Sequence, residues 1–418
     1  MRELWVKILH TSGARVYKLI SSLIVFVITA RLLGAEGRGL IVAVITWVTL
    51  FSTVGHFSLG QVSIHRASQV KGKDWYSKTF ISLIYLGILI SLASIIIAFI
   101  LFVYSNGEFY GGIPASLLII GFFLLPLQIW EKYSSSLLMA IDKLNKYNKA
   151  LIIGSSFNLL LTAVFVGVFK WGVIGALISN IISQIYISSA GLIILWKMYD
   201  RRIMFELQEA IRLFSDGFKL HLNAIGAFLI NKSDILMLNH FLLVRDVGIY
   251  QFAYQLISIL LIIPTATLSV FYSKMAQVGV NKFWDNQKKI MIKILAIIIL
   301  ISLIGFILAP YIIPFIAGEE FSNSINIFRL LLISLFGLSF STLMANQWVG
   351  RGLFWQNSLV TIVSGLINIT LNLIWIPQFG INGAAWATIV STCGVTLLIN
   401  LCMYFYCNKA NKKDLEVS

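Results

Sequence analysis

Apolar residues in this chain form long uninterrupted segments that are separated by short polar stretches. A segment of 18 or more apolar residues is long enough to cross a bilayer core of about 30 Å as an α-helix. Twelve segments meet this criterion, near 16–33, 40–59, 79–102, 113–130, 150–169, 173–196, 218–242, 248–268, 291–309, 326–348, 357–376 and 384–406. The pattern predicts an all-α integral membrane protein with twelve transmembrane helices.

Polar side chains interrupt the seventh segment, 218–242. They include His221, Asn223, Asn231, Lys232, Asp234 and His240. A charged side chain near mid-bilayer costs roughly 2.5–3.5 kcal/mol on insertion scales, so such residues are rare and mark function by default. Lys232 and Asp234 are two positions apart and point in nearly opposite directions on a straight helix. One should face a wet cavity and the other a neighbouring helix, unless the helix is broken and water reaches both charges.

Three short motifs recur at an offset of 208–210 residues, about half the chain. The paired segments are 172–176 with 380–384, 158–161 with 368–371, and 33–40 with 242–249. Each half contains six predicted spans, an even number, so both halves enter the membrane from the same side. The sequence predicts two six-helix lobes, over 1–205 and 206–418, related by a parallel internal repeat. This architecture is typical of transporters.

The repeat also pairs polar faces of the fifth and eleventh segments. Their members are Asn148, Ser155, Asn158 and Thr162 in the fifth, and Asn357, Thr361, Ser364, Asn368 and Asn372 in the eleventh. Such a face could bind sugar hydroxyls or could pack helices together, and its occurrence in both halves favours packing. The polar stretches 131–149 and 200–215 have helical periodicity with charges on one face, which predicts interfacial helices between spans.

Composition and charge agree with a membrane protein. Only 12% of residues are charged, which is about half the charged fraction of a soluble domain. The mean hydropathy is +0.88. The net charge of +15 would suggest nucleic acid in a soluble chain. If both termini are cytoplasmic, however, 26 of the 32 Lys and Arg lie on the inner side and four on the outer side. The basic excess is therefore a topology signal and a contact with membrane lipids, and no nucleic-acid partner is expected.

No arrangement of residues typical of an enzyme is present. The sequence has no nucleophile–base set, no Walker-type loop and no metal-ligand cluster, and its three cysteines all lie in the last apolar segment. We therefore expect no cofactor, no metal and no enzymatic activity. A membrane glycan polymerase would need catalytic acids at the outer face. Those available are scattered over short loops: Glu36, Glu108, Asp246, Glu319 and Glu320.

Three stretches resemble one family. The Leu-Gly-x-x-x-x-Gly turn of 33–39, the Gly-Ile-Tyr of 248–250, and the Asn-rich helix, Pro377 and Gly-Ile-x-Gly-Ala-Ala of 357–385 are similar to motifs of the multidrug, oligosaccharidyl-lipid and polysaccharide exporters. The nearest branch is the polysaccharide transporters, the O-antigen repeat-unit flippases. Two relatives remain as alternatives: ion-coupled drug or metabolite antiporters, and peptidoglycan-precursor flippases, which usually carry two further C-terminal helices.

The resemblance implies transport by alternating access. The expected substrate is undecaprenyl-diphosphate-linked oligosaccharide, moved from the cytoplasmic to the outer leaflet of a bacterial cytoplasmic membrane. A coupling ion, H+ or Na+, would supply energy. A two-lobed monomer would enclose the complete path, and association with other polysaccharide-assembly proteins is possible.

Cationic residues are the natural partners of a diphosphate. We expect Lys232 to face it, with Asp234 as an ion partner or proton acceptor. Further expected lumen residues are Arg31, Arg329, His221, Asn223 and Asn231. Arg329 lies about one turn inside the outer end of its span and could instead snorkel to the interface. Arg15 and Lys18 lie at the inner mouth, where they bind either substrate or lipid headgroups.

Overall fold

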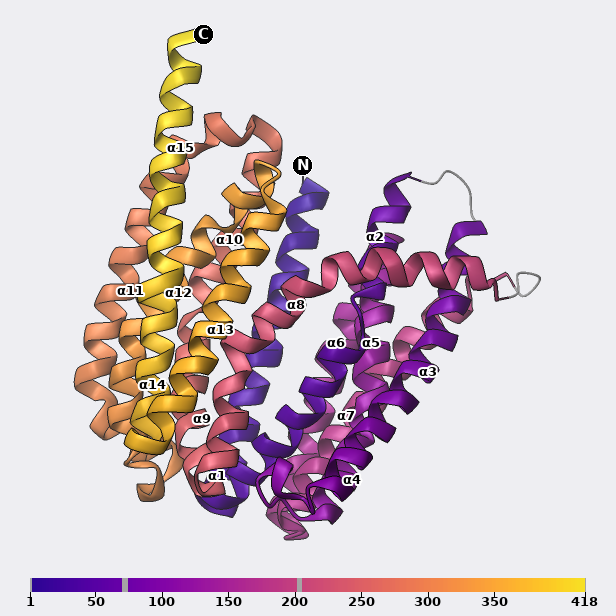
Figure 1. Cartoon of the computed structure of the whole chain (residues 1–418), viewed down its shortest axis with the longest axis vertical. Helices are drawn as coiled ribbons and strands as arrows, with labels where there is room; N and C mark the ends of the chain where they lie inside the picture. Colours follow the sequence, from indigo (N-terminus) through magenta and orange to yellow (C-terminus); the bar gives the residue numbers. More distant parts are fainter. Residues whose placement is uncertain (1, 70–73, 201–204, 418) are drawn as a thin grey trace. The chain divides into compact units, whose positions relative to one another are not determined.

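The computed structural model consists of helices (Figure 1). It describes residues 2–69, 74–200 and 205–417, and every regular element within these ranges is helical. The chain divides into two compact units, Met1–Ile225 and Gly226–Ser418, which we call the N-lobe and the C-lobe. The boundary falls later than the predicted 205/206 because the first half of the connecting helix packs into the N-lobe. There Leu213 is fully buried in the same apolar cluster as Leu59 and Tyr133.

The N-lobe is built on a long, kinked first helix and the helices that pack against it. Its elements are α1 (Arg2–Gly55), α2 (Leu59–Gln69), α3 (Asp74–Tyr104), the short η1 (Glu108–Tyr110), α4 (Ala115–Phe122), α5 (Leu124–Ala140), α6 (Leu144–Thr162), the π-helical η2 (Ala163–Val168), α7 (Gly172–Trp196) and the first half of α8 (Leu207–Phe241). α1 contacts α5, α6 and α7.

The C-lobe surrounds one central helix, α12. Its elements are the second half of α8, then α9 (Val244–Leu260), α10 (Ile262–Val278), α11 (Val280–Ala317), the short η3 (Glu319–Phe321), α12 (Ser324–Gly350), α13 (Phe354–Phe379), α14 (Ile381–Ile389), the π-helical η4 (Val390–Thr396) and α15 (Leu397–Val417). α12 contacts α9, α10, α11, α13, α14 and α15, so most of its surface is buried inside the lobe.

Ten helices in the described ranges are long and apolar enough to cross a membrane. They account for eleven of the predicted spans, because α1 contains the first two. α8 contains the seventh span and is not one of the ten, since polar residues lower its hydropathy. The prediction of an all-α, twelve-span chain in two lobes is therefore confirmed, and the protein is a multi-pass membrane protein.

The internal repeat is visible in the backbone. Gly172 before α7 and Gly380 before α14 are 208 positions apart, and both have a positive φ, 61° and 58°. The kink of α1 at Gly34 (φ 66°, ψ −172°) corresponds to the break at Leu243 between α8 and α9. Only glycine adopts such a conformation easily at Gly34, Gly172 and Gly380. The two halves thus bend at equivalent positions.

The expected interfacial helix over 131–149 is not a separate element. α5 continues through Glu131 to Ala140, and α6 begins at Leu144 after one turn. The prediction was wrong because the charges of Glu131 and Lys132 were taken to end the span at 130. In the second stretch, 200–215, residues 201–204 lie outside the described ranges, and Leu207 already belongs to α8.

Candidate functional site

Asp234 lies in the second half of α8 and is only 3% exposed. Three uncharged groups of the C-lobe donate hydrogen bonds to its carboxylate. Tyr250 Oη of α9 and Thr388 Oγ1 of α14 are each 2.7 Å from Oδ2, and Asn372 Nδ2 of α13 is 2.6 Å from Oδ1. A buried carboxylate is costly unless such bonds replace its water. The C-lobe therefore holds Asp234 in a prepared polar pocket.

The polar face of α13 continues this network inside the C-lobe. Asn372 Nδ2 also donates to Asn368 Oδ1 at 3.0 Å, and Asn368 Nδ2 donates to Ser391 Oγ at 3.4 Å. Ser233, next to Asp234, donates to Asn368 Oδ1 at 3.0 Å. Asn368 and Asn372 are fully buried. In the C-lobe the repeated polar face therefore packs helices together, as its duplication suggested.

Lys232 and Asn231 precede this pocket on α8 and are more accessible. Lys232 is half-buried, and the side chain of Asn231 is exposed. Asn231 accepts a hydrogen bond from Tyr254 Oη at 3.1 Å and donates to the carbonyl oxygen of Ala227. Asp234 is thus buried, whereas Lys232, two positions before it, is half-buried and Asn231 is exposed.

Arg329 binds a neighbouring helix of its own lobe. Its Nε donates to the carbonyl oxygen of Phe306 at 3.0 Å, and its guanidinium carbon lies 4.6 Å from the Phe306 ring centroid. Both contacts join α12 to α11. The side chain is half-buried, which fits a packing cation with an aromatic partner.

His221 lies in the N-lobe, not beside Lys232 and Asp234. It is 3% exposed, its Nε2 is 3.0 Å from the carbonyl oxygen of Val54, and its ring centroid is 5.2 Å from that of His56. These contacts fix the first half of α8 to the end of α1. The structure does not bring His221 together with the other expected lumen residues.

The remaining expected residues are surface positions of the N-lobe. Arg15, Arg31 and Asn223 are exposed. Lys18 is also exposed, but it lines a polar cavity within the lobe. This cavity is the feature that sequence reasoning missed.

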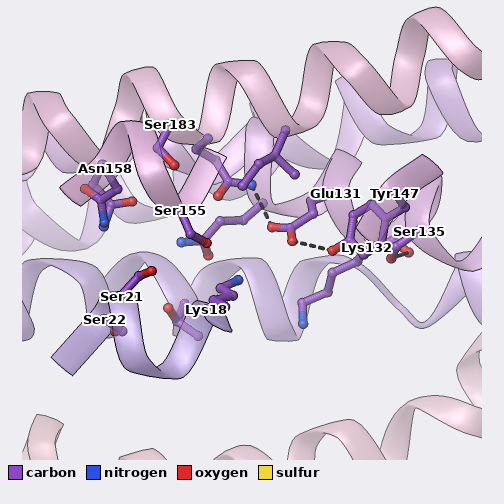
Figure 2. A pocket seen from close by; sticks show the side chains of 15 residues that line it. Lys18, Ser21, Ser22, Glu131, Lys132, Ser135, Tyr147, Ser155, Asn158 and Ser183 are labelled. Atoms are coloured by element: carbon purple, nitrogen blue, oxygen red, sulfur yellow. Dashed lines mark hydrogen bonds between the residues drawn. The ribbon is translucent and has the colours of Figure 1, made fainter. Parts of the chain in front are cut away.

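The cavity lies among α1, α5, α6 and α7 and has a volume of about 450 Å³ (Figure 2). Nearly all the residues that line it are polar: Lys18, Ser21, Ser22, Thr49, Gln128, Glu131, Lys132, Ser135, Tyr147, Ser155, Asn158, Asn180, Ser183, Gln184 and Ile187. Its volume is within the range of small-molecule sites, roughly 300–1,000 Å³, but those sites are mostly apolar. A polar cavity inside a membrane lobe therefore requires an explanation.

Glu131 is the one acid that lines this cavity. Tyr147 Oη donates to its Oε1 at 2.6 Å, and Gln184 Nε2 donates to its Oε2 at 2.7 Å. The side chains of Lys18 and Lys132 line the same cavity. The two hydrogen bonds offset part of the cost of burying the carboxyl group. The polar face with Ser155 and Asn158 is the sequence signal for this site, but the charges of 131–149 predicted an interfacial helix, whereas α5 continues through Glu131.

Within the described ranges, no group of three or more His, Cys, Asp or Glu side chains is arranged to bind a metal ion.

The fold is shared with several solved transporters. The lipid II flippase MurJ in an inward closed conformation matches with a TM-score of 0.77 at 16% identity, covering 97% of this chain and 91% of its own. An inward-facing multidrug resistance MATE family transporter of the MOP superfamily matches with a TM-score of 0.70 at 16% identity, covering 95% and 96%. A MOP superfamily transporter from Pyrococcus furiosus matches with a TM-score of 0.60 at 15% identity, covering 96% of each chain.

Sequence comparison identifies a family. A search of curated proteins finds no match. A scan against protein families matches residues 4–278 to the family described as polysaccharide biosynthesis protein, which is more than half of the chain. Together with the fold, this match shows that the chain belongs to the polysaccharide biosynthesis protein family and has the two-lobe helical fold of the MOP superfamily.

Proposed function

We propose that this protein is a flippase for undecaprenyl-diphosphate-linked oligosaccharide. It would move an O-antigen-type repeat unit from the cytoplasmic to the outer leaflet of a bacterial inner membrane by alternating access. Membership of the polysaccharide biosynthesis family supports a glycan substrate. The structurally similar MurJ is named a flippase of lipid II, which supports a lipid-linked substrate. The charge bias across the spans supports cytoplasmic termini.

The position of Lys232 is the observation that carries the proposal. It is a half-buried cation at the centre of the seventh span, where a charge is expensive unless it has a function. Asp234 is engaged by uncharged donors of α9, α13 and α14. A cation at this depth has the charge that an entering diphosphate requires, and an ammonium acts on phosphate as a point charge.

Lys232→Ala should abolish surface polysaccharide while the protein still accumulates in the membrane. The direct measurement is the sidedness of lipid-linked oligosaccharide, which should collect on the cytoplasmic face. Lys232→Arg, which keeps the charge, should retain part of the activity. Lys282→Ala, at an exposed cation in the first turn of α11, is the control. Normal sidedness in Lys232→Ala would refute the role of this residue.

Asp234 is the proposed coupling residue, with H+ or Na+ as the ion. Its carboxylate is buried, pre-arranged by three donors, and two positions from Lys232. Protonation or a bound cation would neutralise it and change the potential at Lys232. Transport by wild-type protein should therefore depend on an ion gradient, and transport by Asp234→Asn should not.

An ion-coupled drug or metabolite antiporter is the competing function, since MATE transporters share the fold. Loss of the protein would then change drug efflux and leave glycan sidedness unchanged. The same sidedness assay therefore separates the two functions.

A further inference from the structure

We propose that the polar cavity of the N-lobe is a sugar-binding subsite for the oligosaccharide of the substrate. This inference rests on the proposed flippase function and adds a position to it. The diphosphate cation was assigned to the C-lobe part of α8, whereas this cavity is lined only by N-lobe residues.

Most of the side chains that line the cavity are uncharged. In Figure 2, Asn158, Ser155 and Ser21 lie toward one end, with Lys18 near Ser21, while Lys132, Tyr147 and Ser135 lie toward the other end. The first end offers neutral hydroxyl and amide groups, which both donate and accept hydrogen bonds. Sugar hydroxyls also donate and accept, so this end matches their chemistry.

The charged side chains of the lining make a metal cation unfavourable as the main ligand. Glu131 is accompanied by two ammonium groups, Lys18 and Lys132, so the net charge of the lining is positive. Hard cations prefer several oxygen ligands with negative charge. A carboxylate that is already held by Tyr147 and Gln184 is instead a rigid acceptor for a hydroxyl.

Two amides of the lining are available for a ligand. Within the described part of the chain, the side chains of Gln128 and Asn180 have no hydrogen-bond partner in the protein. A membrane protein must satisfy its polar groups internally or with water and ligand, because lipid offers no partners. Gln128 lies on α5 and Asn180 on α7, so these amides approach the cavity from two different helices.

The C-lobe provides an internal comparison for the cavity. By the repeat, Asn158 of α6 corresponds to Asn368 of α13. Asn368 is fully buried in bonds to Ser233, Asn372 and Ser391, whereas Asn158 is half-buried and lines the cavity. The amide at this position is enclosed by protein in the C-lobe, whereas in the N-lobe Asn158, with Ser155 of the same face, borders a cavity. Helix packing alone explains the C-lobe face but does not explain the open N-lobe face.

The test compares a substrate that carries sugar with one that does not. Full-length protein in proteoliposomes is supplied with undecaprenyl diphosphate bearing one sugar residue, or with undecaprenyl diphosphate alone. Arrival in the outer leaflet is followed with membrane-impermeant periodate for the sugar lipid and with added phosphatase for the sugar-free lipid. The variants are Gln128→Ala, Asn180→Ala and the double variant, and the matched control is Asn145→Ala, an exposed amide on α6 outside the cavity.

The double variant should move the sugar-bearing lipid about 10-fold more slowly, and each single variant about 3-fold more slowly, as expected for lost hydrogen bonds between uncharged groups. The sugar-free lipid should move at the wild-type rate, which also shows that the variants fold. An equal loss with both lipids, or no loss with either, would overturn the subsite. A wild-type protein that moves neither lipid would refute the flippase function and the subsite with it.

Discussion

Replacement of Asp234 separates the structural and functional roles of its pocket. In Asp234→Ala, Tyr250 Oη can donate to Thr388 Oγ1, 3.1 Å away, and Thr388 Oγ1 can donate to the carbonyl oxygen of Ala384, also 3.1 Å away. Asn372 keeps its bond to Asn368 but loses the partner of its other N–H. One buried donor without an acceptor costs about 1–3 kcal/mol.

Asp234→Asn preserves the shape of the side chain and most of the bonds. Its oxygen can accept from Tyr250 and Thr388, and its new N–H can donate to Asn372 Oδ1, an oxygen that is buried without a partner. This arrangement requires Asn372 to turn its amide and give up the bond to Asn368, at about 1 kcal/mol. Removal of a buried charge from a pocket of uncharged donors offsets this cost, because desolvation of an ion costs several kcal/mol.

We therefore expect Asp234→Asn to be as stable as the wild type or more stable, and Asp234→Ala to be less stable than Asp234→Asn by about 2 kcal/mol. For a lobe of this size the difference corresponds to roughly 4–8 °C in melting temperature. Melting is followed by tryptophan fluorescence in detergent. Since a ligand that binds only the folded state stabilises it, Na+ or a lower pH should raise the melting temperature of the wild type but not of Asp234→Asn.

A strong destabilisation of Asp234→Asn would refute this reasoning. It would mean that the carboxylate contributes to stability through a partner other than the three donors. Equal stability of all three proteins would mean that the hydrogen bonds at Asp234 carry little energy.

Two other positions give predictions that the structure makes specific. A Cβ on Gly383 would collide with the backbone oxygen of Trp375, so Gly383→Ala should lower the free energy of unfolding by about 3 kcal/mol or more and accumulate poorly on immunoblots. The control is Gly394→Ala, whose Cβ would have its nearest neighbour at an ordinary 3.5 Å and which should accumulate normally. Arg329→Ala removes a hydrogen bond and an aromatic contact on a half-exposed side chain, so melting should fall slightly, by about 1 kcal/mol, while flipping persists. If Arg329→Ala folds well but no longer flips substrate, Arg329 acts in the lumen and not only in helix packing.

Most of the fold could be predicted because span length and the repeat are properties of the sequence alone. Long apolar segments identify membrane helices, and the glycines at 172 and 380 mark equivalent turns with positive φ. These inferences need no knowledge of which helices are neighbours.

The partners of each polar residue could not be predicted, because they depend on tertiary packing. The sequence predicts His221 as a lumen residue together with Lys232, yet it packs against Val54 and His56 of the N-lobe. The charge of Glu131 predicted an interfacial helix after the span, whereas Tyr147 and Gln184 from α6 and α7 bind its carboxylate inside the bundle. Hydropathy cannot distinguish a charge in a loop from a charge whose partners lie on neighbouring helices.

The two lobes have similar helix arrangements, but their buried polar groups have different surroundings. In the C-lobe, Asp234 and the α13 amides satisfy one another through direct hydrogen bonds. In the N-lobe, Tyr147 and Gln184 donate to the two oxygens of Glu131, and the amides of Gln128 and Asn180 line a cavity of about 450 Å³. The two lobes can therefore have different roles. In the proposed function, Asp234 of the C-lobe couples transport to an ion, and the N-lobe cavity binds the sugar. The division is tested by the paired variants: Asp234→Asn should remove ion dependence for every substrate, and the Gln128 and Asn180 variants should affect only those that carry sugar.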